Sequence, residues 1–168
     1  ALAEAAAEAG ARVTLVAGPV NLPTPAHVQR VDVISAQDML DACLAALPAD
    51  VFIASAAVAD YRPASAAEQK MKKDATNEDG LTLTLVRNPD ILATLARRKG
   101  NRQVVGFALQ DRNGEKRALM KLEKKGMDWV ILNGLAAQGA SSAEVVLLGK
   151  DGSREKIGPS PKKILAKA

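Results

Sequence analysis

Short apolar runs rich in Val, Ile and Leu alternate along this chain with helical segments, and this alternation constrains the fold more than any other feature. Such runs are typical of strands buried on both faces of a parallel sheet. Strands that alternate with helices indicate an α/β fold, a doubly wound, mostly parallel, Rossmann-like sheet. The predicted strands are Val13–Ala17, Val31–Ile34, Val51–Ser55, Leu81–Val86, Gln103–Phe107 and Asp128–Leu132.

Helix start and stop signals lie between these strands. Ser35 is typical of an N-cap, Pro48 closes the helix that follows it, and Asn88-Pro89-Asp90 begins another helix. The predicted helices are Ala1–Gly10, Ser35–Leu47, the segment from Asp90 to about Gly100, Gly114–Gly126 and the segment that begins at Ser160. Residues 56–80 are predicted to form a long, polar, largely irregular loop, and loops of that length usually have a function or lack order.

The C-terminal part has the pattern of a β-hairpin. Two short apolar segments, Val145–Leu148 and Glu155–Ile157, flank the turn residues Lys150-Asp151-Gly152. The sheet is therefore expected to end in an antiparallel hairpin.

The first helix runs directly into the buried strand Val13–Ala17, which is the pattern of the second half of a βαβ unit. The first half of such a unit usually holds a phosphate-binding turn. We therefore expect residues 1–168 to form a single domain that lacks its N-terminal strand and phosphate loop.

Charge and composition narrow the class of ligand. The net charge is +4, and the Lys residues gather at 70–73 and 121–125. Aromatic residues make up 2% of the chain, which is too few for the stacking platforms of a nucleic-acid binder, and the sequence also lacks a long basic stripe. Local basic clusters fit a small polyanion such as a nucleoside triphosphate.

Other residues point to a cytoplasmic protein without a metal centre of its own. Cys43 is the single cysteine and lies on an apolar helix face, so we expect it to pack in the core. No apolar run reaches the ~18 residues that span a bilayer, and the first residues lack the basic region of a signal peptide. His27 has no partner at ligand spacing, so any Mg²⁺ is expected to arrive with a nucleotide.

Unusual polar segments follow four of the predicted strands. Because ligands bind beyond the carboxyl ends of parallel strands, these segments are expected to meet at one edge of the sheet. They are Ala56–Pro63, Asn88–Leu92, Phe107–Asp111 and Asn133-Gly134.

Each candidate residue also has an ordinary structural explanation. Asp60 suits a turn as well as a ligand, and Asp90 suits a helix cap as well as an anion site. Lys70 lies in the long loop, either on a solvated surface or in a lid that neutralises phosphates. Lys121 and Lys125 are one helical turn apart, so they are either surface lysines or a pair that binds one anion.

Several segments in order resemble the bacterial phosphopantothenoylcysteine synthetase family, the phosphopantothenate–cysteine ligases of coenzyme A biosynthesis. The similarity covers nearly the whole chain. The segments are Val13–Pro25, Ala56–Pro63, Lys70–Lys73, Asn88–Leu92, Val105–Ala108 and Lys121–Asp128.

The resemblance implies a ligase that joins 4′-phosphopantothenate and L-cysteine with CTP and Mg²⁺ through an acyl-cytidylate. It implies that Lys70 is the catalytic lid lysine. It implies that the nucleotide is bound by Ala56, Ala57, Asp60, Lys70, Pro89, Asp90, Ile91, Leu92, Phe107, Lys121 and Lys125. It further implies a homodimer and a flavin-dependent decarboxylase domain fused upstream.

Two alternatives remain at this point. A non-catalytic nucleotide-binding module would share the fold and the basic clusters. A short-chain-type, nicotinamide-dependent reductase would need a Lys four residues after its Tyr, but Tyr61 is followed at that distance by Ser65. The chain differs from the family pattern at Gln110-Asp111 and Gly134, and the preference for CTP over ATP stays open.

Overall fold

A computed structural model of the chain describes residues 1–65, 69, 82–110, 113–134 and 140–167. The elements are α1 (Leu2–Glu8), β1 (Val13–Ala17), β2 (Val28–Asp32), α2 (Ala36–Ala45), β3 (Val51–Ala54), β4 (Tyr61–Pro63), β5 (Leu85–Arg87), α3 (Ile91–Arg97), β6 (Gln103–Gln110), α4 (Gly114–Lys125), β7 (Trp129–Gly134), β8 (Ser142–Gly149), β9 (Arg154–Pro161) and α5 (Lys162–Leu165).

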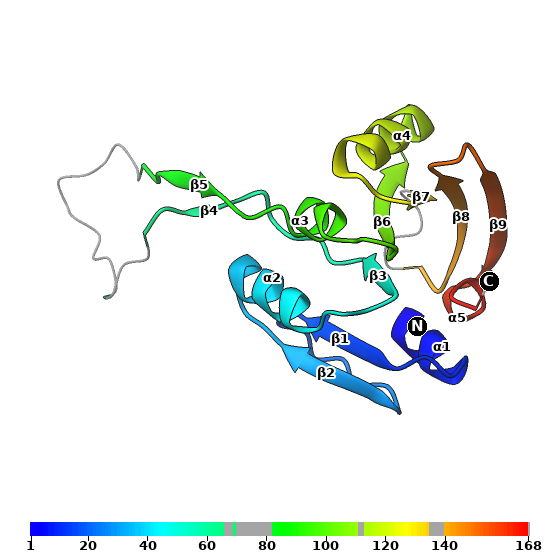
Figure 1. Ribbon diagram of the computed structural model, residues 1–168, viewed down its shortest axis with the longest axis horizontal. Helices are drawn as coiled ribbons and strands as arrows, with labels where there is room; N and C mark the ends of the chain where they lie inside the picture. The colour runs from blue at the N-terminus through cyan, green and yellow to red at the C-terminus, as the bar shows by residue number, and fades with distance from the viewer. Residues whose placement is uncertain (66–68, 70–81, 111–112, 135–139, 168) are drawn as a thin grey trace.

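A five-stranded sheet in the order β3-β6-β7-β8-β9 forms the body of the molecule (Figure 1). β3, β6 and β7 are parallel, whereas β8 and β9 continue the sheet as an antiparallel hairpin. Helices α3 and α4 pack on it, and the largest core cluster joins them to β6, β7 and β8. The α/β fold with parallel central strands and the C-terminal hairpin are thereby confirmed.

The strands β1 and β2 form a separate parallel pair. Helix α2 links this pair to the larger sheet, because its Leu40 and Cys43 pack between Val16 of β1 and Phe52 of β3. The predicted core position of Cys43 is confirmed, and burial raises the pKa of its thiol. The parallel strands thus lie in two sheets that one helix connects.

The ladder between β1 and β2 corrects a predicted boundary. The sequence placed a strand at Val31–Ile34, but β2 spans Val28–Asp32, in register with the whole of β1. After Asp32 the chain turns into α2, which Ser35 caps as predicted. The Ser35 hydroxyl accepts a hydrogen bond from the Asp38 amide at 3.1 Å, and the Asp38 carboxylate accepts one from the Ser35 amide at 2.9 Å.

The loop after β3 contains structure that the sequence did not indicate. β4 and β5 pair antiparallel and project from the body as an arm (Figure 1). The predicted strand Leu81–Val86 is therefore corrected to Leu85–Arg87 among the described residues, and all three of its residues are exposed rather than half-buried. Its partner is β4, whose short sequence carries no alternating pattern.

Other bounds differ at strand ends, where pairing with a neighbour extends a strand beyond its apolar run. β6 continues to Gln110 and β7 to Gly134 because the two strands pair to their last residues. The hairpin strands are likewise longer than predicted, and α5 is confined to Lys162–Leu165.

The buried carboxylate of Asp128 lies at the amino ends of β6 and β7, opposite the carboxyl ends of these strands. Asp128 is 2% exposed, accepts a hydrogen bond from the Val104 amide at 2.9 Å, and forms ion pairs with Lys99 at 2.8 Å and with Lys150. It therefore ties the start of β6 to the α3–β6 turn and to the hairpin turn.

Candidate functional site

The predicted site residues converge on one cleft. A cleft of about 2370 Å³ runs along the carboxyl ends of β3 and β6, past the N-terminus of α3 and one side of α4. All of the predicted nucleotide-binding residues that the structure describes line it, namely Ala56, Ala57, Asp60, Pro89, Asp90, Ile91, Leu92, Phe107, Lys121 and Lys125.

A hydrogen-bond network fixes the loop after β3 against the start of α3. The Asn88 side chain donates to the Ala59 carbonyl at 2.8 Å, and the Asn88 amide donates to the Asp60 carbonyl at 2.9 Å. The guanidinium of Arg62 donates to the Asn88 side-chain oxygen at 3.1 Å and to the Arg87 carbonyl at 2.9 Å. This network positions the Asp60 backbone at the mouth of the cleft.

Sequence reasoning did not single out Arg62 or the Asn88 side chain. Their partners lie up to 29 residues away along the chain, so no local spacing reveals the pairing. The signal available was the position of both residues inside the segments that resemble the family.

Asp90 has two roles at once. Its carboxylate caps α3 by accepting from the Ala93 amide at 3.0 Å, and it forms an ion pair with Lys125 at 3.2 Å. Burial opposes ionisation, but the Ala93 amide and the Lys125 ammonium outweigh it, so the pKa of Asp90 lies below its ordinary value. The cap and the site interpretation of Asp90 are therefore compatible.

Lys121 points into the cleft from α4. Its half-buried ammonium donates to the Phe107 carbonyl at 2.7 Å. Burial lowers the pKa of Lys121, as does the Lys125 charge, whereas Asp90 and Asp60 raise it. Lys121 therefore lies within electrostatic reach of Lys125, Asp90 and Asp60, and its ammonium has further donors for an anion beyond the one that the carbonyl takes.

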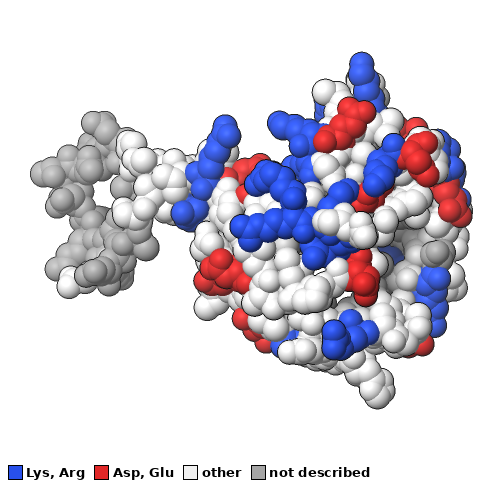
Figure 2. Space-filling model, in the orientation of Figure 1, with Lys and Arg blue, Asp and Glu red and all other residues white. Residues whose placement is uncertain are grey.

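Positive charge dominates this face of the molecule. Figure 2 shows Lys and Arg gathered over α3 and α4, beside the base of the β4–β5 arm. Lys124 and Arg87 line the cleft together with Lys121 and Lys125, so its basic side chains outnumber Asp60 and Asp90 on its polar wall. An anionic ligand suits this wall.

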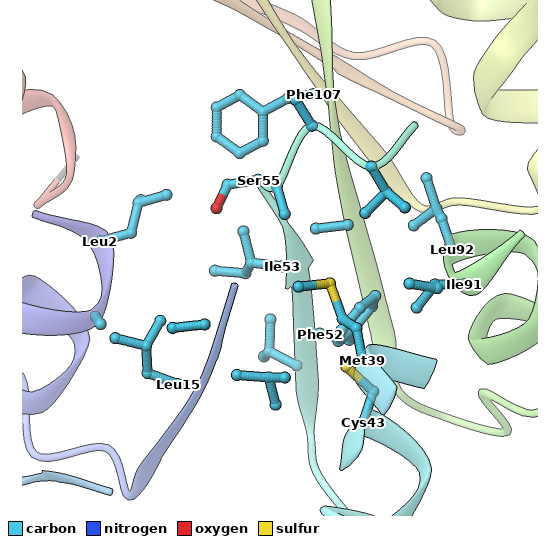
Figure 3. Close-up of a pocket in the computed structure, with 18 of the residues that line it drawn as sticks. Leu2, Leu15, Met39, Cys43, Phe52, Ile53, Ser55, Ile91, Leu92 and Phe107 are labelled. Carbon is cyan, nitrogen blue, oxygen red and sulfur yellow. The ribbon is translucent and has the colours of Figure 1, made fainter. Parts of the chain in front are cut away.

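The apolar candidates form the floor. Ile91 and Leu92 are each 8% exposed and belong to two different core clusters. Figure 3 shows both side chains at the start of α3, with Phe107 on the opposite side of the β3 carboxyl end. Ile91 and Leu92 therefore anchor the start of α3 in the core beside the cleft, and Phe107 contributes an aromatic ring to the cleft wall.

Three further predictions concern Lys70, a metal centre and membrane-spanning segments. Lys70, the predicted catalytic lysine, lies outside the described residues. In the part of the chain that is described, no group of three or more His, Cys, Asp and Glu side chains is placed to hold a metal ion. None of the described helices has the length and apolar character needed to cross a bilayer.

Comparison with known proteins places the chain in a family. The model of the DNA/pantothenate metabolism flavoprotein C-terminal domain matches residues 1–168. The coenzyme A biosynthesis bifunctional protein CoaBC of Vibrio vulnificus strain YJ016 is 51% identical over 141 residues, which is 83% of this chain and 35% of that protein. The protein of the same name from Escherichia coli K12 is 48% identical over 146 residues, 84% of this chain and 36% of its own length.

A solved structure agrees with these relatives. The crystal structure of the C-terminal domain of a CoaBC protein superposes with a TM-score of 0.81 at 35% identity, covering 99% of this chain and 74% of that one. The chain spans about a third of the length of the curated relatives it matches. The motifs at the cleft, the matching family model and the shared fold lead to one conclusion: the chain belongs to the DNA/pantothenate metabolism flavoprotein C-terminal domain family, the synthetase family that its sequence resembles.

Proposed function

We propose that this domain is a phosphopantothenate–cysteine ligase that uses CTP. The observation that carries the proposal is the convergence of Ala56, Asp60, Phe107, Lys121 and Lys125 on one basic cleft, in a chain whose relatives are coenzyme A biosynthesis proteins. A ligase of this kind has to bind a triphosphate and a phosphorylated carboxylate together, and a large basic cleft suits two anionic substrates.

The reaction has two steps. A carboxylate oxygen of 4′-phosphopantothenate attacks the α-phosphorus of CTP, and pyrophosphate leaves as the bond to the β-phosphate breaks. The amine of L-cysteine then attacks the acyl carbon of the resulting acyl-cytidylate. A C–N bond forms, CMP leaves with the electrons of the broken C–O bond, and the amine nitrogen gives up a proton.

The described residues serve binding and charge stabilisation in this scheme. We infer that the Lys121 and Lys125 ammonium groups, which line the cleft, hold phosphate oxygens and balance the charge that develops as pyrophosphate leaves. The small side chains of Ala56 and Ala57 leave the backbone open to a ribose or a flat base. Asp60 would accept hydrogen bonds from the nucleoside.

Lys70 and Mg²⁺ complete the proposal. We infer that Lys70 acts as a lid lysine over the reacting phosphate. Asp90 is already engaged by Ala93 and Lys125, so a bound Mg²⁺ would be held mainly by the triphosphate. The metal would neutralise phosphate charge there.

The family also motivates a proposal about partners and location. We propose that the domain works as a homodimer in the cytoplasm, in a longer protein that also carries a flavin-dependent decarboxylase domain. The relatives bear the name bifunctional, which supports the fusion.

The test is a stepwise assay of the full-length protein. With CTP, Mg²⁺ and 4′-phosphopantothenate but no cysteine, we expect about one pyrophosphate per site, and cysteine should then release CMP and allow turnover. Titration calorimetry with CTP and, separately, ATP should show preferential binding of CTP. Nucleotide binding without pyrophosphate release would favour a non-catalytic module, and NADPH oxidation would favour a reductase.

A further inference from the structure

Asn88 binds two successive carbonyl groups of the loop that follows β3. Its side-chain amide donates to the Ala59 carbonyl at 2.8 Å, and its backbone amide donates to the Asp60 carbonyl at 2.9 Å. These carbonyls belong to the peptide planes on either side of Asp60, and each peptide unit is planar. Because both planes are held, the direction in which the Asp60 side chain leaves the backbone is set by Asn88.

The two sides of this contact differ in how firmly they are supported. Residues 56–60 are exposed and belong to no helix or strand, so contacts with other segments have to position them. Asn88 is half-buried and precedes Pro89, which restricts its backbone to an extended conformation. Directly after it, Ile91 and Leu92 are each 8% exposed and anchor the start of α3 in the core. Asn88 therefore ties an exposed loop to a rigid support.

The side-chain amide of Asn88 has only one favourable orientation. The Arg62 guanidinium donates to its oxygen at 3.1 Å and to the Arg87 carbonyl at 2.9 Å, while the nitrogen faces the Ala59 carbonyl. A flipped amide would set its NH2 group against the guanidinium and its oxygen against the carbonyl. The site therefore requires a donor and an acceptor on one short side chain, which is the chemistry of Asn.

Arg62 lies one layer behind Asn88. It is on β4, whereas Asn88 follows β5, and the two residues meet where the β4–β5 arm joins the body of the molecule (Figure 1). Among the described residues that line the cleft, Asn88 is included and Arg62 is not. Arg62 therefore influences a ligand in the cleft through Asn88 rather than by contact.

The residue that Asn88 positions faces the charged part of the cleft. Asp60 lines the cleft, and its charge raises the pKa of Lys121, so the carboxylate lies within electrostatic reach of that lysine. Hydrogen bonds weaken steeply when distance or angle departs from the optimum. A ligand that spans Asp60 and the α4 lysines therefore depends on where the loop holds Asp60.

We propose that Asn88 is a positioning residue for the nucleoside part of the ligand. Its amide holds the Ala59 and Asp60 carbonyls, Arg62 keeps that amide in the required orientation, and the Asp60 carboxylate is thereby directed at the nucleoside. Because Asp60 meets a nucleoside only if the domain binds CTP, this role of Asn88 rests on the proposed function. The phosphates contact lysines on α4, which Asn88 does not hold, so loss of Asn88 should affect only the nucleoside end.

Titration calorimetry of the full-length protein with two probes, CTP and inorganic tripolyphosphate, each with Mg²⁺, separates the two ends of the ligand. Asn88→Ala should weaken CTP binding roughly 5- to 50-fold, as expected for the loss of one or two hydrogen bonds. It adds no charge, so it should change tripolyphosphate binding by less than about twofold. Unchanged binding of tripolyphosphate also shows that the variant is folded.

Asn101→Ala is the matched control, because Asn101 is exposed in the turn between α3 and β6 and does not line the cleft. It should change the affinity for either probe by less than about twofold. In the pyrophosphate assay, Asn88→Ala should raise the KM for CTP by the same factor as the Kd. Its kcat should fall by less than about threefold, because an interaction remote from the reacting atoms contributes equally to the ground state and the transition state.

Arg62 is tested by the ratio of the affinities for CTP and tripolyphosphate, which cancels the effect of its charge on both anions. Arg62→Gln should lower this ratio in the parent protein, and Arg62→Lys, which keeps a donor, should lower it less. In the Asn88→Ala background, Arg62→Gln should change the ratio by less than about twofold, because its partner is already absent. An undiminished effect in that background would overturn the role of Arg62.

The possible failures are distinguishable. Equal CTP affinity in Asn88→Ala and in a parent protein that turns over would overturn the role of Asn88 and leave the proposed function intact. A parallel loss of CTP and tripolyphosphate binding would also overturn it, because Asn88 would then support the whole cleft. A parent protein that neither binds CTP nor releases pyrophosphate would overturn the proposed function, and the role of Asn88 with it.

Discussion

The environment of Asp128 lowers the pKa of its carboxyl group and thereby makes the stability of the fold depend on pH. Burial alone would raise its pKa, but the Lys150 and Lys99 ammonium groups and the Val104 amide lower it from the ordinary 3.8 to about 2. The native state therefore holds this proton less tightly than the unfolded chain does. The resulting stabilisation is fully present above the unfolded pKa and is lost as pH falls from about 4 towards 2.

Replacement of Asp128 should remove this pH dependence. We expect Asp128→Asn to reduce the free energy of unfolding at pH 7 by about 2–4 kcal/mol, because two lysines lose a buried counter-charge. The difference from the parent chain should shrink as the pH is lowered towards 2. Denaturant titrations at several pH values measure both effects.

Asp41→Asn is the control for this variant, since Asp41 is exposed and accepts a hydrogen bond from Gln37 in the preceding turn of its own helix. It should change stability by less than about 0.5 kcal/mol at every pH. A pH-independent loss in Asp128→Asn would show that packing, rather than the charge, is responsible.

Lys121 sets the affinity of the cleft for an anion, if the proposed function holds. Lys121→Gln should weaken CTP binding roughly 10- to 100-fold, which corresponds to the ~1.5–3 kcal/mol of a charge-assisted hydrogen bond. The fold should be unaffected, as the Phe107 carbonyl can accept from the amide. Titration calorimetry of this variant and of Lys116→Gln, an exposed α4 lysine outside the cleft, makes the comparison; equal affinities in the two would remove Lys121 from the site.

At the scale of single elements, α2 depends on its capping box. The reciprocal bonds between Ser35 and Asp38 satisfy the backbone amides of both residues at the N-terminus of a short helix. Because α2 packs against both β1 and β3, loss of its first turn would weaken the contact between the two sheets.

Loss of the cap should be measurable by itself. Ser35→Ala is expected to lower the free energy of unfolding by about 1 kcal/mol, whereas Ser35→Thr keeps a hydroxyl acceptor and should lower it by less. Urea unfolding followed by circular dichroism distinguishes them. Identical midpoints for the Ala and Thr variants would mean that the hydroxyl contributes nothing.

At the scale of the whole molecule, Phe52 joins two parts of the core. Its ring packs against the cluster beneath α3 and α4 and also against the cluster that α2 forms with α3. Helix α3 contributes residues to both clusters as well, so Phe52 and α3 together connect the two parts of the core.

Truncation of Phe52 should therefore affect both parts. We expect Phe52→Ala to lower the free energy of unfolding by about 2–4 kcal/mol, less than for a fully buried Phe because the ring is half-buried. Met120→Ala, on the exposed side of α4, should be within about 0.5 kcal/mol of the parent. A single-cluster effect, seen as hydrogen exchange that speeds up in α4 but not in α2, would contradict the joining role.

The sequence by itself determined the fold class, the Ser35 cap, the core position of Cys43, the C-terminal hairpin and the family. These features depend on local periodicity, on capping chemistry and on short motifs, all of which are written in neighbouring residues. The meeting of Asp60 and Asp90 in one cleft could also be predicted, because polar segments that follow strands were expected to meet at one edge of the sheet. Lys121 and Lys125 lie on α4, and only the family resemblance assigned them to the same site.

Only the tertiary structure decided the rest. The Arg62–Asn88 network, the pairing of β4 with β5 and the three contacts of Asp128 join residues that are 22 to 29 positions apart, and no local pattern encodes such pairings. The edge positions of β1 and β3 in the described sheets are likewise not encoded locally, since they depend on which strands become neighbours in space. Strand pairing and burial are properties of the assembled chain, and that is the physical reason why the structure was needed to see them.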